Sequence, residues 1–318
     1  MKLFDPHIHM TSRTTDDYGK MAAAGIVAVV EPAFWLGQPR THVGSFEDYF
    51  LSLLGWERFR ASQFGIKHFC TIGLNPKESN NPRLAEGVME MLPRYLEKDG
   101  VVAVGEIGYD DMTDHEDRLF RAQLQLARDH HLPVLIHTPH RDKVRGTQRT
   151  LALLRETSFP EEMVLVDHNT EETLPLILET KCWAGHSIYP STKMDETRMA
   201  ALVRRYGPHR ILINSAADWG VSDPLKVPKT VDAMRNVGIS EADIEAIVWH
   251  NPRNFFAQSG RLDPAELDKH GGIDQTQLWE GNSVLRGQSP RMRAAGGAQA
   301  DAPAPVPNGD PNRDNGAK

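Results

Sequence analysis

Short apolar runs alternate along the chain with longer segments in which apolar residues recur at helical spacing. Eight of these runs are rich in β-branched residues and become polar mainly at their last positions. Near-continuous apolar runs predict strands that are covered on both faces, as in a parallel sheet. The predicted strands span residues 2–10, 26–34, 67–75, 101–109, 133–139, 163–169, 182–189 and 211–218.

The segments between these strands predict helices. In residues 82–100, for example, Pro82 stands where a helix can begin and Gly100 where it can end. Eight strands that alternate with helices over roughly 240 residues predict a TIM (β/α)8 barrel. A doubly wound open sheet is the rival architecture, but it usually has fewer strands, and no G-x-G-x-x-G motif follows the first strand.

The end of the chain differs from this body. Ser240 and Asp243 form a capping signal for a further helix, and Asn251-Pro252 begins another, so we expect extra C-terminal helices. In residues 286–318, 17 of the 33 residues are Ala, Gly or Pro, and none is aromatic. Such a segment buries too little surface to offset its ordering entropy. We predict one domain over residues 1–285 and a disordered tail over residues 286–318.

Polar residues gather at the ends of the predicted strands, where the active site of such a barrel lies. Seven of the eight strands carry a carboxylate or an imidazole there. In chain order these residues are His7, His9, Glu31, Glu106, His137, Asp167, His168, His186 and Asp218. The two-residue spacing of His7 and His9 points both imidazoles to one face of a strand. A carboxylate such as Glu106 inside a barrel is costly unless it is paired or binds a metal, so the set predicts a metal centre.

The residue types narrow the chemistry of this centre. Imidazole and carboxylate ligands without thiolates suit Zn, Mn, Ni or Fe, which leaves the identity of the metal open. If six of these nine side chains act as ligands, they exceed one tetrahedral set and allow two divalent ions that share a carboxylate. Two ions about 3.5–4 Å apart would clamp a bridging hydroxide as the nucleophile. A carboxylate such as Asp218 would then shuttle protons.

Composition excludes several other classes. The chain has 36 Lys and Arg against 43 Asp and Glu, and a net charge of −7 argues against a surface that coats nucleic acid. Cys70 and Cys182 cannot build a disulfide framework. No run approaches the roughly 18 apolar residues of a membrane span, and the first ten residues lack the core of a secretory signal. We therefore expect a cytoplasmic protein that acts on a small, anionic molecule and does not enter a membrane. The sequence does not determine its oligomeric state.

Several motifs together resemble the TatD-like metal-dependent hydrolases of the amidohydrolase superfamily. The motifs are His7-x-His9, VGEIG around Glu106, FRAQLQLARDHHLPVLIHT ending beside His137, VDH at His168, Asp218 after the eighth strand and NPRNFF at 251–256. The resemblance covers about residues 1–257 and is most specific over residues 101–138. It implies a TIM barrel with two metals, in which His7, His9 and Asp218 hold one ion, His137 and His168 hold the other, and Glu106 bridges them.

The chain also departs from the pattern of that family. The usual Glu-Thr-Asp-x-Pro is replaced by Ala-Ala-Asp-Trp-Gly at 216–220, and the arginine that commonly follows the fifth-strand histidine is replaced by Thr-Pro-His-Arg at 138–141. Glu31 and His186 are polar strand ends outside the family pattern, and we treat them as additional candidates for the site. These departures indicate a divergent subgroup with an altered substrate.

Four residues are candidates for contacts with substrate. The loop over residues 34–45 is longer than usual and carries Trp35 and Arg40, which makes it a candidate lid or binding loop. His140 and Arg141 follow the fifth strand, with Lys143 two residues further on, and this turn could bind a phosphate or a carboxylate. A packed surface loop and a solvated charged turn explain the two segments about equally well.

The leading hypothesis is a divalent-metal-dependent hydrolase that cleaves a phosphoester or an amide/lactone-type bond of a small anionic metabolite. Glu106 and Asp218 would be its catalytic carboxylates. A TatD-like 3′–5′ exonuclease or DNase is one alternative, which the acidic composition does not favour. A metal-dependent isomerase on the same barrel and a non-catalytic, metal-stabilised binding protein are the others.

Overall fold

Parallel strands form the centre of the computed structural model, which describes residues 1–189, 192–269 and 271–276. Within these ranges one sheet holds eight strands, and each strand pairs in parallel with the next along the chain. The strands are β1 (Leu3–Asp5), β2 (Ile26–Pro32), β3 (Lys67–Ile72), β4 (Val101–Gly108), β5 (Val134–His137), β6 (Val164–Val166), β7 (Trp183–Ser187) and β8 (Ile211–Asn214).

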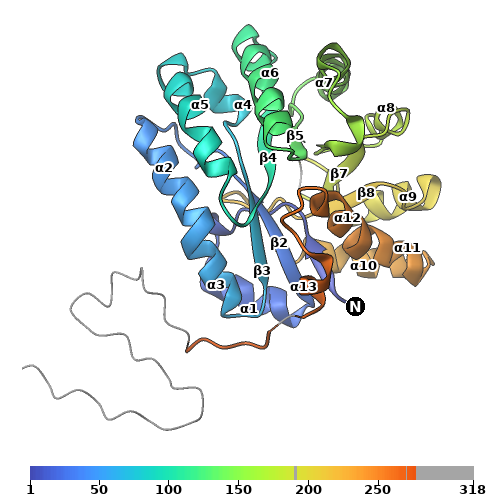
Figure 1. Ribbon diagram of the computed structural model, residues 1–318. Helices are drawn as coiled ribbons and strands as arrows, with labels where there is room; N and C mark the ends of the chain where they lie inside the picture. Colours follow the sequence, from blue (N-terminus) through green and yellow to red (C-terminus); the bar gives the residue numbers. More distant parts are fainter. Residues whose placement is uncertain (190–191, 270, 277–318) are drawn as a thin grey trace, which may run out of the picture. The chain divides into compact units, whose positions relative to one another are not determined.

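Helices follow the strands along the chain and lie outside them (Figure 1). The longest, α6, begins with the capping box that Thr113 and Glu116 form. The described helices are α1 (Thr15–Ala23), α2 (Val43–Leu51), α3 (Arg58–Ser62), α4 (Pro76–Ser79), α5 (Pro82–Leu96), α6 (Asp114–Asp129), α7 (Lys143–Thr157), α8 (Leu174–Leu178), α9 (Glu196–Tyr206), α10 (Lys226–Asn236), α11 (Glu241–Glu245), α12 (Asn251–Ala257) and α13 (Pro264–Asp268). The predicted TIM barrel is thereby confirmed, and the expected helices after β8 are present.

The segments that follow β1 and β8 join the two ends of the sheet. The backbone N–H of Ala216 donates to the carbonyl of His7 at 2.8 Å, and the N–H of His9 donates to the carbonyl of Ala217 at 2.9 Å. These hydrogen bonds nearly close the barrel. They also fix the histidine segment against the segment that leads to Asp218.

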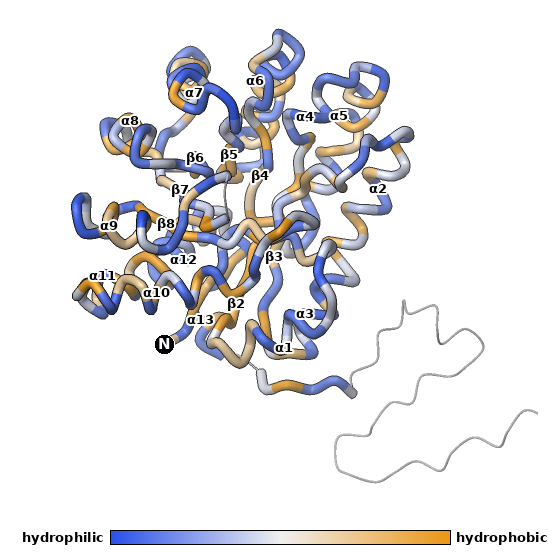
Figure 2. Tube along the Cα trace, turned by 180° about the vertical axis from the view of Figure 1, so that it is seen from behind, coloured by the Kyte–Doolittle hydropathy of each residue, from blue (hydrophilic) through white to orange (hydrophobic). Residues whose placement is uncertain are grey.

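Alternating strand positions build two apolar layers, one inside the barrel and one between the barrel and its helices. The inner layer includes Leu135, Leu165 and Leu212, whereas Val134 and Val164 pack with the helices. Hydrophobic residues accordingly concentrate along the strands in Figure 2, and hydrophilic residues on the outer sides of the helices. Burial on both faces explains why the strand sequences are apolar runs and not alternating patterns.

The helices after β8 cover the N-terminal end of the barrel. Trp249, Phe255 and Phe256 belong to the same apolar cluster as the inward-facing Phe4 and Leu165. The rings of Phe4 and Phe256 lie 6.1 Å apart. This plug leaves the opposite end, where the strands finish, for polar side chains.

All eight strands end earlier than predicted, and two of these differences concern residues of the site. β1 ends at Asp5, so His7 and His9 lie just beyond it, and β8 ends at Asn214, four residues before Asp218. The physical reason is the closure described above, in which the segments after both strands bond to each other and no longer follow the regular ladder.

Residues Met1–Gln275 form one compact unit. The predicted boundary at 285 and the predicted tail over residues 286–318 lie outside the described residues. In the described part of the chain, no helix combines the length and the apolar character that crossing a membrane requires.

Truncation of the inner layer tests its contribution to stability. Leu165 is 1% exposed and Leu51 is 52% exposed. We expect Leu165→Ala to lower the free energy of unfolding by about 2–5 kcal/mol, because it leaves a cavity inside the barrel. Leu51→Ala, the matched control, should change it by less than about 0.5 kcal/mol. Urea denaturation followed by circular dichroism measures both, and equal effects would contradict the layered core.

Candidate metal centre

The polar residues of the site continue the inner apolar layer toward the end of the barrel. Because side chains alternate along a strand, a residue two positions after an inward-facing leucine also points inward. The resulting pairs are Leu135 and His137 on β5, Leu165 and Asp167 at β6, and Leu212 and Asn214 on β8. The barrel thus changes from apolar to polar within one step of two residues.

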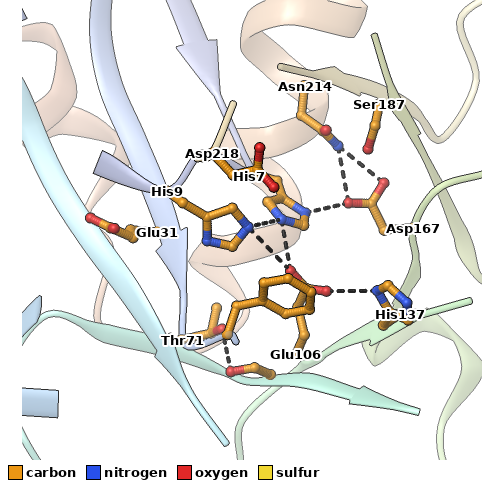
Figure 3. A network of polar contacts seen from close by, with 12 residues as sticks. His7, His9, Glu31, Thr71, Glu106, His137, Asp167, Ser187, Asn214 and Asp218 are labelled. Atoms are coloured by element: carbon orange, nitrogen blue, oxygen red, sulfur yellow. Dashed lines mark hydrogen bonds and ion pairs between the residues drawn. The ribbon is translucent and has the colours of Figure 1, made fainter. Parts of the chain in front are cut away.

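Glu106 lies at the centre of this polar layer, and Figure 3 shows it between His7 and His9 on one side and His137 on the other. Oε1 lies 2.7 Å from Nε2 of His7 and 3.7 Å from Nε2 of His9. Oε2 lies 3.0 Å from Nδ1 of His137 and 3.8 Å from Nε2 of His168. All five side chains are buried. One carboxylate therefore joins two imidazole pairs inside the barrel.

Asp167 determines how the ring of His7 is oriented. Its Oδ2 lies 2.5 Å from Nδ1 of His7, and Nδ2 of Asn214 donates to both carboxylate oxygens at 3.0 and 3.1 Å. Gly185 makes room for this carboxylate, since a Cβ at that position would lie 2.4 Å from Oδ1 of Asp167. With Nδ1 of His7 committed to Asp167, Nε2 is the nitrogen that faces Glu106 and His9. A histidine whose second nitrogen is held by a carboxylate is a common arrangement in metal sites.

His168 is held in a similar way. Its Nδ1 lies 2.7 Å from the hydroxyl of Ser187 on β7, which directs Nε2 toward Glu106. Its backbone has a φ of 63°, in the left-handed region that residues other than glycine seldom adopt. Such backbone conformations cluster at functional sites, where the surrounding structure maintains them.

Electrostatics favour a cation between these groups. Burial lowers the pKa of His7, but the charges of Glu106 and Asp167 outweigh it and raise that pKa to about 10. Burial and the nearby charge of His7 lower the pKa of His9 to about 4, so its ring stays neutral and keeps a lone pair. Burial opposes ionisation of Glu106, yet His7, His137 and His168 bring its pKa well below the usual range.

The residues present fit a divalent metal ion. Atoms of His7, Glu106 and His168 that can act as ligands all lie within 4.8 Å of one another. Nδ1 of His9 is buried and makes no hydrogen bond to any described residue. Nε2 of His7 and Nε2 of His9 lie only 3.0 Å apart, and such an approach of nitrogen donors calls for a cation or a proton between them. Imidazole nitrogens and a carboxylate oxygen form a donor set that suits first-row transition metals.

Comparison with known proteins agrees with this geometry. A family model described as TatD related DNase matches residues 4–257. The chain belongs to the TatD-related DNase family. It is 30% identical over 259 residues to a metal-dependent hydrolase of Methanocaldococcus jannaschii, a match that covers 80% of this chain and 99% of that relative. The chain is therefore a TatD-like metal-dependent hydrolase.

Two solved structures show the same barrel. A TatD-like protein from Archaeoglobus fulgidus is 29% identical, with a TM-score of 0.66 over 80% of this chain and 99% of that protein. A phosphotriesterase homology protein from Escherichia coli, solved with phosphate in its active site, is 14% identical, with a TM-score of 0.60 over 80% of this chain and 98% of that protein. The second likeness is one of fold.

Asp218 borders the cluster of this TatD-related chain from the loop after β8. Its Oδ1 accepts hydrogen bonds from the Tyr189 hydroxyl and from the backbone N–H of Gly220, both at 2.8 Å. The negative charge of Asp218 acts on the buried ring of His9. Asp218 is half-buried, in contrast to the buried ligand candidates inside the barrel.

Glu31 lies outside the cluster, which corrects its inclusion among the site candidates. Its Oε2 lies 2.9 Å from Nε2 of His68, and its Oε1 accepts the backbone N–H of Thr11 at 2.8 Å. His68 stands on the neighbouring strand β3, where it precedes the inward-facing Phe69 and takes the opposite face. In Figure 3 the carboxylate of Glu31 lies apart from the contacts that converge on His7 and Glu106.

His186 is likewise directed away from the cluster. Gly185 faces Asp167 and Ser187 contacts His168, so these two positions of β7 point inward. His186 stands between them and therefore takes the outer face. It is buried there, and burial lowers its pKa to about 4, which keeps it neutral. The sequence correctly placed His186 near the end of a strand, but its side chain lies on the outer face of the sheet and not inside the barrel.

The candidates for substrate contact divide into two groups. Trp35 and His140 line an open pocket together with His137, next to the cluster. Arg141 is exposed. Arg40 is committed elsewhere, because its buried guanidinium pairs with Glu78 and donates to the carbonyl of Phe34. Arg40 therefore braces the loop and is not directed into the pocket.

The supporting residues were not predicted from the sequence. Asp167 stood among the polar strand ends, but nothing in the sequence assigned it to His7, which lies 160 positions away. The position of Asn214 could have been predicted, because it follows the inward-facing Leu212 by two residues and should therefore also point into the barrel. Of two lysines near the site, Lys143 belongs to the basic turn that the sequence offered for binding a phosphate or a carboxylate, whereas Lys193 had no assigned role.

Removal of the Asp167 charge tests the orientation of His7. We expect Asp167→Asn to weaken metal binding by about 10- to 100-fold, because Nδ1 of His7 loses its carboxylate partner. Calorimetric titration of the metal-free protein with Zn²⁺ and Mn²⁺ measures this change. Glu31→Gln is the matched control, since it neutralises another buried carboxylate outside the cluster, and it should leave the metal affinity unchanged. Equal affinities of Asp167→Asn and wild type would contradict the assigned role.

Proposed function

We propose that this TatD-related chain is a two-metal hydrolase that cleaves a phosphoester or an amide/lactone-type bond of a small anionic substrate. The observation that carries the proposal is the division of Glu106 between two histidine pairs. Its two oxygens point in different directions, and each lies within 3.0 Å of an imidazole nitrogen. A carboxylate so placed is suited to bridge two ions.

In this proposal the six buried or bordering side chains form two ligand sets. His7, His9 and Asp218 would hold one divalent ion, and His137 and His168 would hold the other, with Glu106 as the bridge. Zn, Mn, Ni and Fe all suit these ligands. When bound, such ions lower the pKa of a water nucleophile and stabilise negative charge that develops on a substrate oxygen.

The residues of the chain itself position the reaction and move its protons. Asp218 is the proposed proton acceptor and donor, because it is half-buried at the border of the cluster, where substrate and solvent meet. Tyr189 orients its Oδ1 through the 2.8 Å hydrogen bond. Trp35 and His140 are the proposed walls of the substrate pocket, since both line the opening beside His137.

A nuclease is the second candidate function. It is favoured by the description of the matching family model as a TatD related DNase. The net charge of −7 and the narrow polar layer favour a small substrate over a long nucleic-acid strand. Family membership favours hydrolysis over isomerisation. A non-catalytic binding protein would have no turnover to lose, so the turnover experiment with Asp218→Asn separates it from an enzyme.

Metal content is the first test. We expect roughly two ions per chain in wild-type protein after chelation and reloading, because the cluster offers two ligand sets. The His7→Ala/His9→Ala double variant should retain fewer, since one set loses two of its three proposed side chains. Elemental analysis after dialysis measures both. Equal metal content in the two proteins, or little metal in either after loading, would contradict the proposal.

Asp218→Asn then tests turnover. Reloaded wild-type protein is screened against phosphomonoesters, phosphodiesters, lactones, amides and single-stranded DNA. On the substrate that is cleaved, we expect Asp218→Asn to lower kcat by roughly 10²- to 10⁴-fold, because the proton carrier is lost. Asp223→Asn is the control, because Asp223 lies on the same loop as Asp218 but its carboxylate pairs with Lys229 of α10. Turnover of DNA alone would favour the nuclease, and turnover of none of these classes would refute the hydrolase.

A further inference from the structure

Two lysines from different strand-end segments lie beside the candidate metal centre. Lys143 is the first residue of α7, which follows β5 and His140. Lys193 lies between β7 and α9. The rings of His140 and His168 stack with their centroids 6.0 Å apart, so the segment that leads into Lys143 packs directly on a proposed metal ligand.

The ammonium group of Lys143 is held in an unfavourable position. Its Nζ is buried and makes no hydrogen bond to a residue that the structure describes. Lys143 also opens α7, where the helix dipole disfavours positive charge. Burial and the charge of Lys193 lower its pKa to about 8. An anion bound between the lysines would relieve all of these costs.

Lys193 belongs to the segment between β7 and α9. Its Nζ lies 5.2 Å from the ring centre of Tyr189, whose hydroxyl donates to Asp218. The charges of Glu106, Asp167 and Asp218 all act on Lys193. The ammonium of Lys193 is therefore within electrostatic reach of the polar layer, and its charge also acts on Lys143.

The carboxylates nearby are already committed to other groups. Asp167 bonds to His7 and Asn214, and Glu106 faces the histidines. Asp218 accepts from Tyr189 and Gly220. Metal ions at Glu106 and Asp218 would balance these two charges, and the two ammonium groups would then lack a counter-charge. This step rests on the proposed two-metal function.

We propose that Lys143 and Lys193 form an anion subsite beside the metal centre, which binds the phosphoryl group of the substrate. Two ammonium groups match the charge of a phosphoryl dianion better than that of a single carboxylate. The first turn of α7 adds backbone N–H groups, since its N-cap residue, Asp142, makes no side-chain cap. The proposal narrows the substrate class to phosphorylated small molecules.

Binding of inorganic phosphate tests the subsite. Calorimetric titrations are made on full-length wild type, Lys143→Met and Lys193→Met, each with and without metal. We expect each substitution to weaken phosphate binding by roughly tenfold to a hundredfold, the usual effect of losing a charged hydrogen-bond donor. Lys67→Met is the matched control, because Lys67 is exposed at the first position of β3, at the opposite end of the barrel from the site, and this variant should bind phosphate like wild type.

Thermal unfolding distinguishes an anion site from a structural lysine. Phosphate should raise the unfolding temperature of wild type but not of Lys143→Met. Without phosphate, Lys143→Met should unfold no earlier than wild type, because it removes a buried charge that has no hydrogen-bond partner among the described residues. A large loss of stability in phosphate-free buffer would indicate a structural role and overturn the proposal.

The remaining outcomes separate this proposal from the hydrolase proposal. Phosphate binding that is the same in both lysine variants and wild type would overturn the subsite, even if two metals are present. Acetate that matches phosphate in affinity and in its dependence on the lysines would overturn the assignment to a phosphoryl group. A wild-type chain that takes up no metal would contradict the proposed function alone, because the titration without metal still measures the dependence on both lysines.

Discussion

A carboxylate buried inside a barrel has to be balanced by positive charge, and Glu106 imposes this requirement on the rest of the structure. Burial alone would favour its neutral form, yet His7, His137 and His168 hold its pKa well below the usual range. The rings of these histidines must therefore be held in place by other groups. Asp167 holds the ring of His7, and Ser187 holds the ring of His168. The candidate metal centre is thus a network of charges that depend on one another across several strands.

The barrel stabilises this network by separating apolar and polar layers. Leu135, Leu165 and Leu212 fill the interior, and the aromatic side chains of the final helices close its N-terminal end. Water is thereby excluded from below, and the polar groups meet solvent and substrate only at the ends of the strands. The stability of the fold and the chemistry of the site consequently occupy successive positions of the same strands.

Much of this organisation was predictable from the sequence. Apolar runs of a few residues predicted the strands, and polar residues at their ends predicted His7, His9, Glu106, His137 and His168 as neighbours, which the structure places together. The errors have a common cause. Glu31 and His186 resemble the other polar strand ends in sequence, but a shift of one position along a strand moves a side chain to the opposite face.

The sequence by itself determined the order of strands and helices, the closed barrel and the residue types at its open end, because these follow from periodicity and from turn signals within short segments. Only the tertiary structure decided which polar residues share a face, that Gly185 makes room for Asp167, and that the charge of Lys193 acts on Lys143. Such relations join residues far apart in the chain. Burial and electrostatic energy depend on what surrounds a group in space, and a linear pattern does not contain that information.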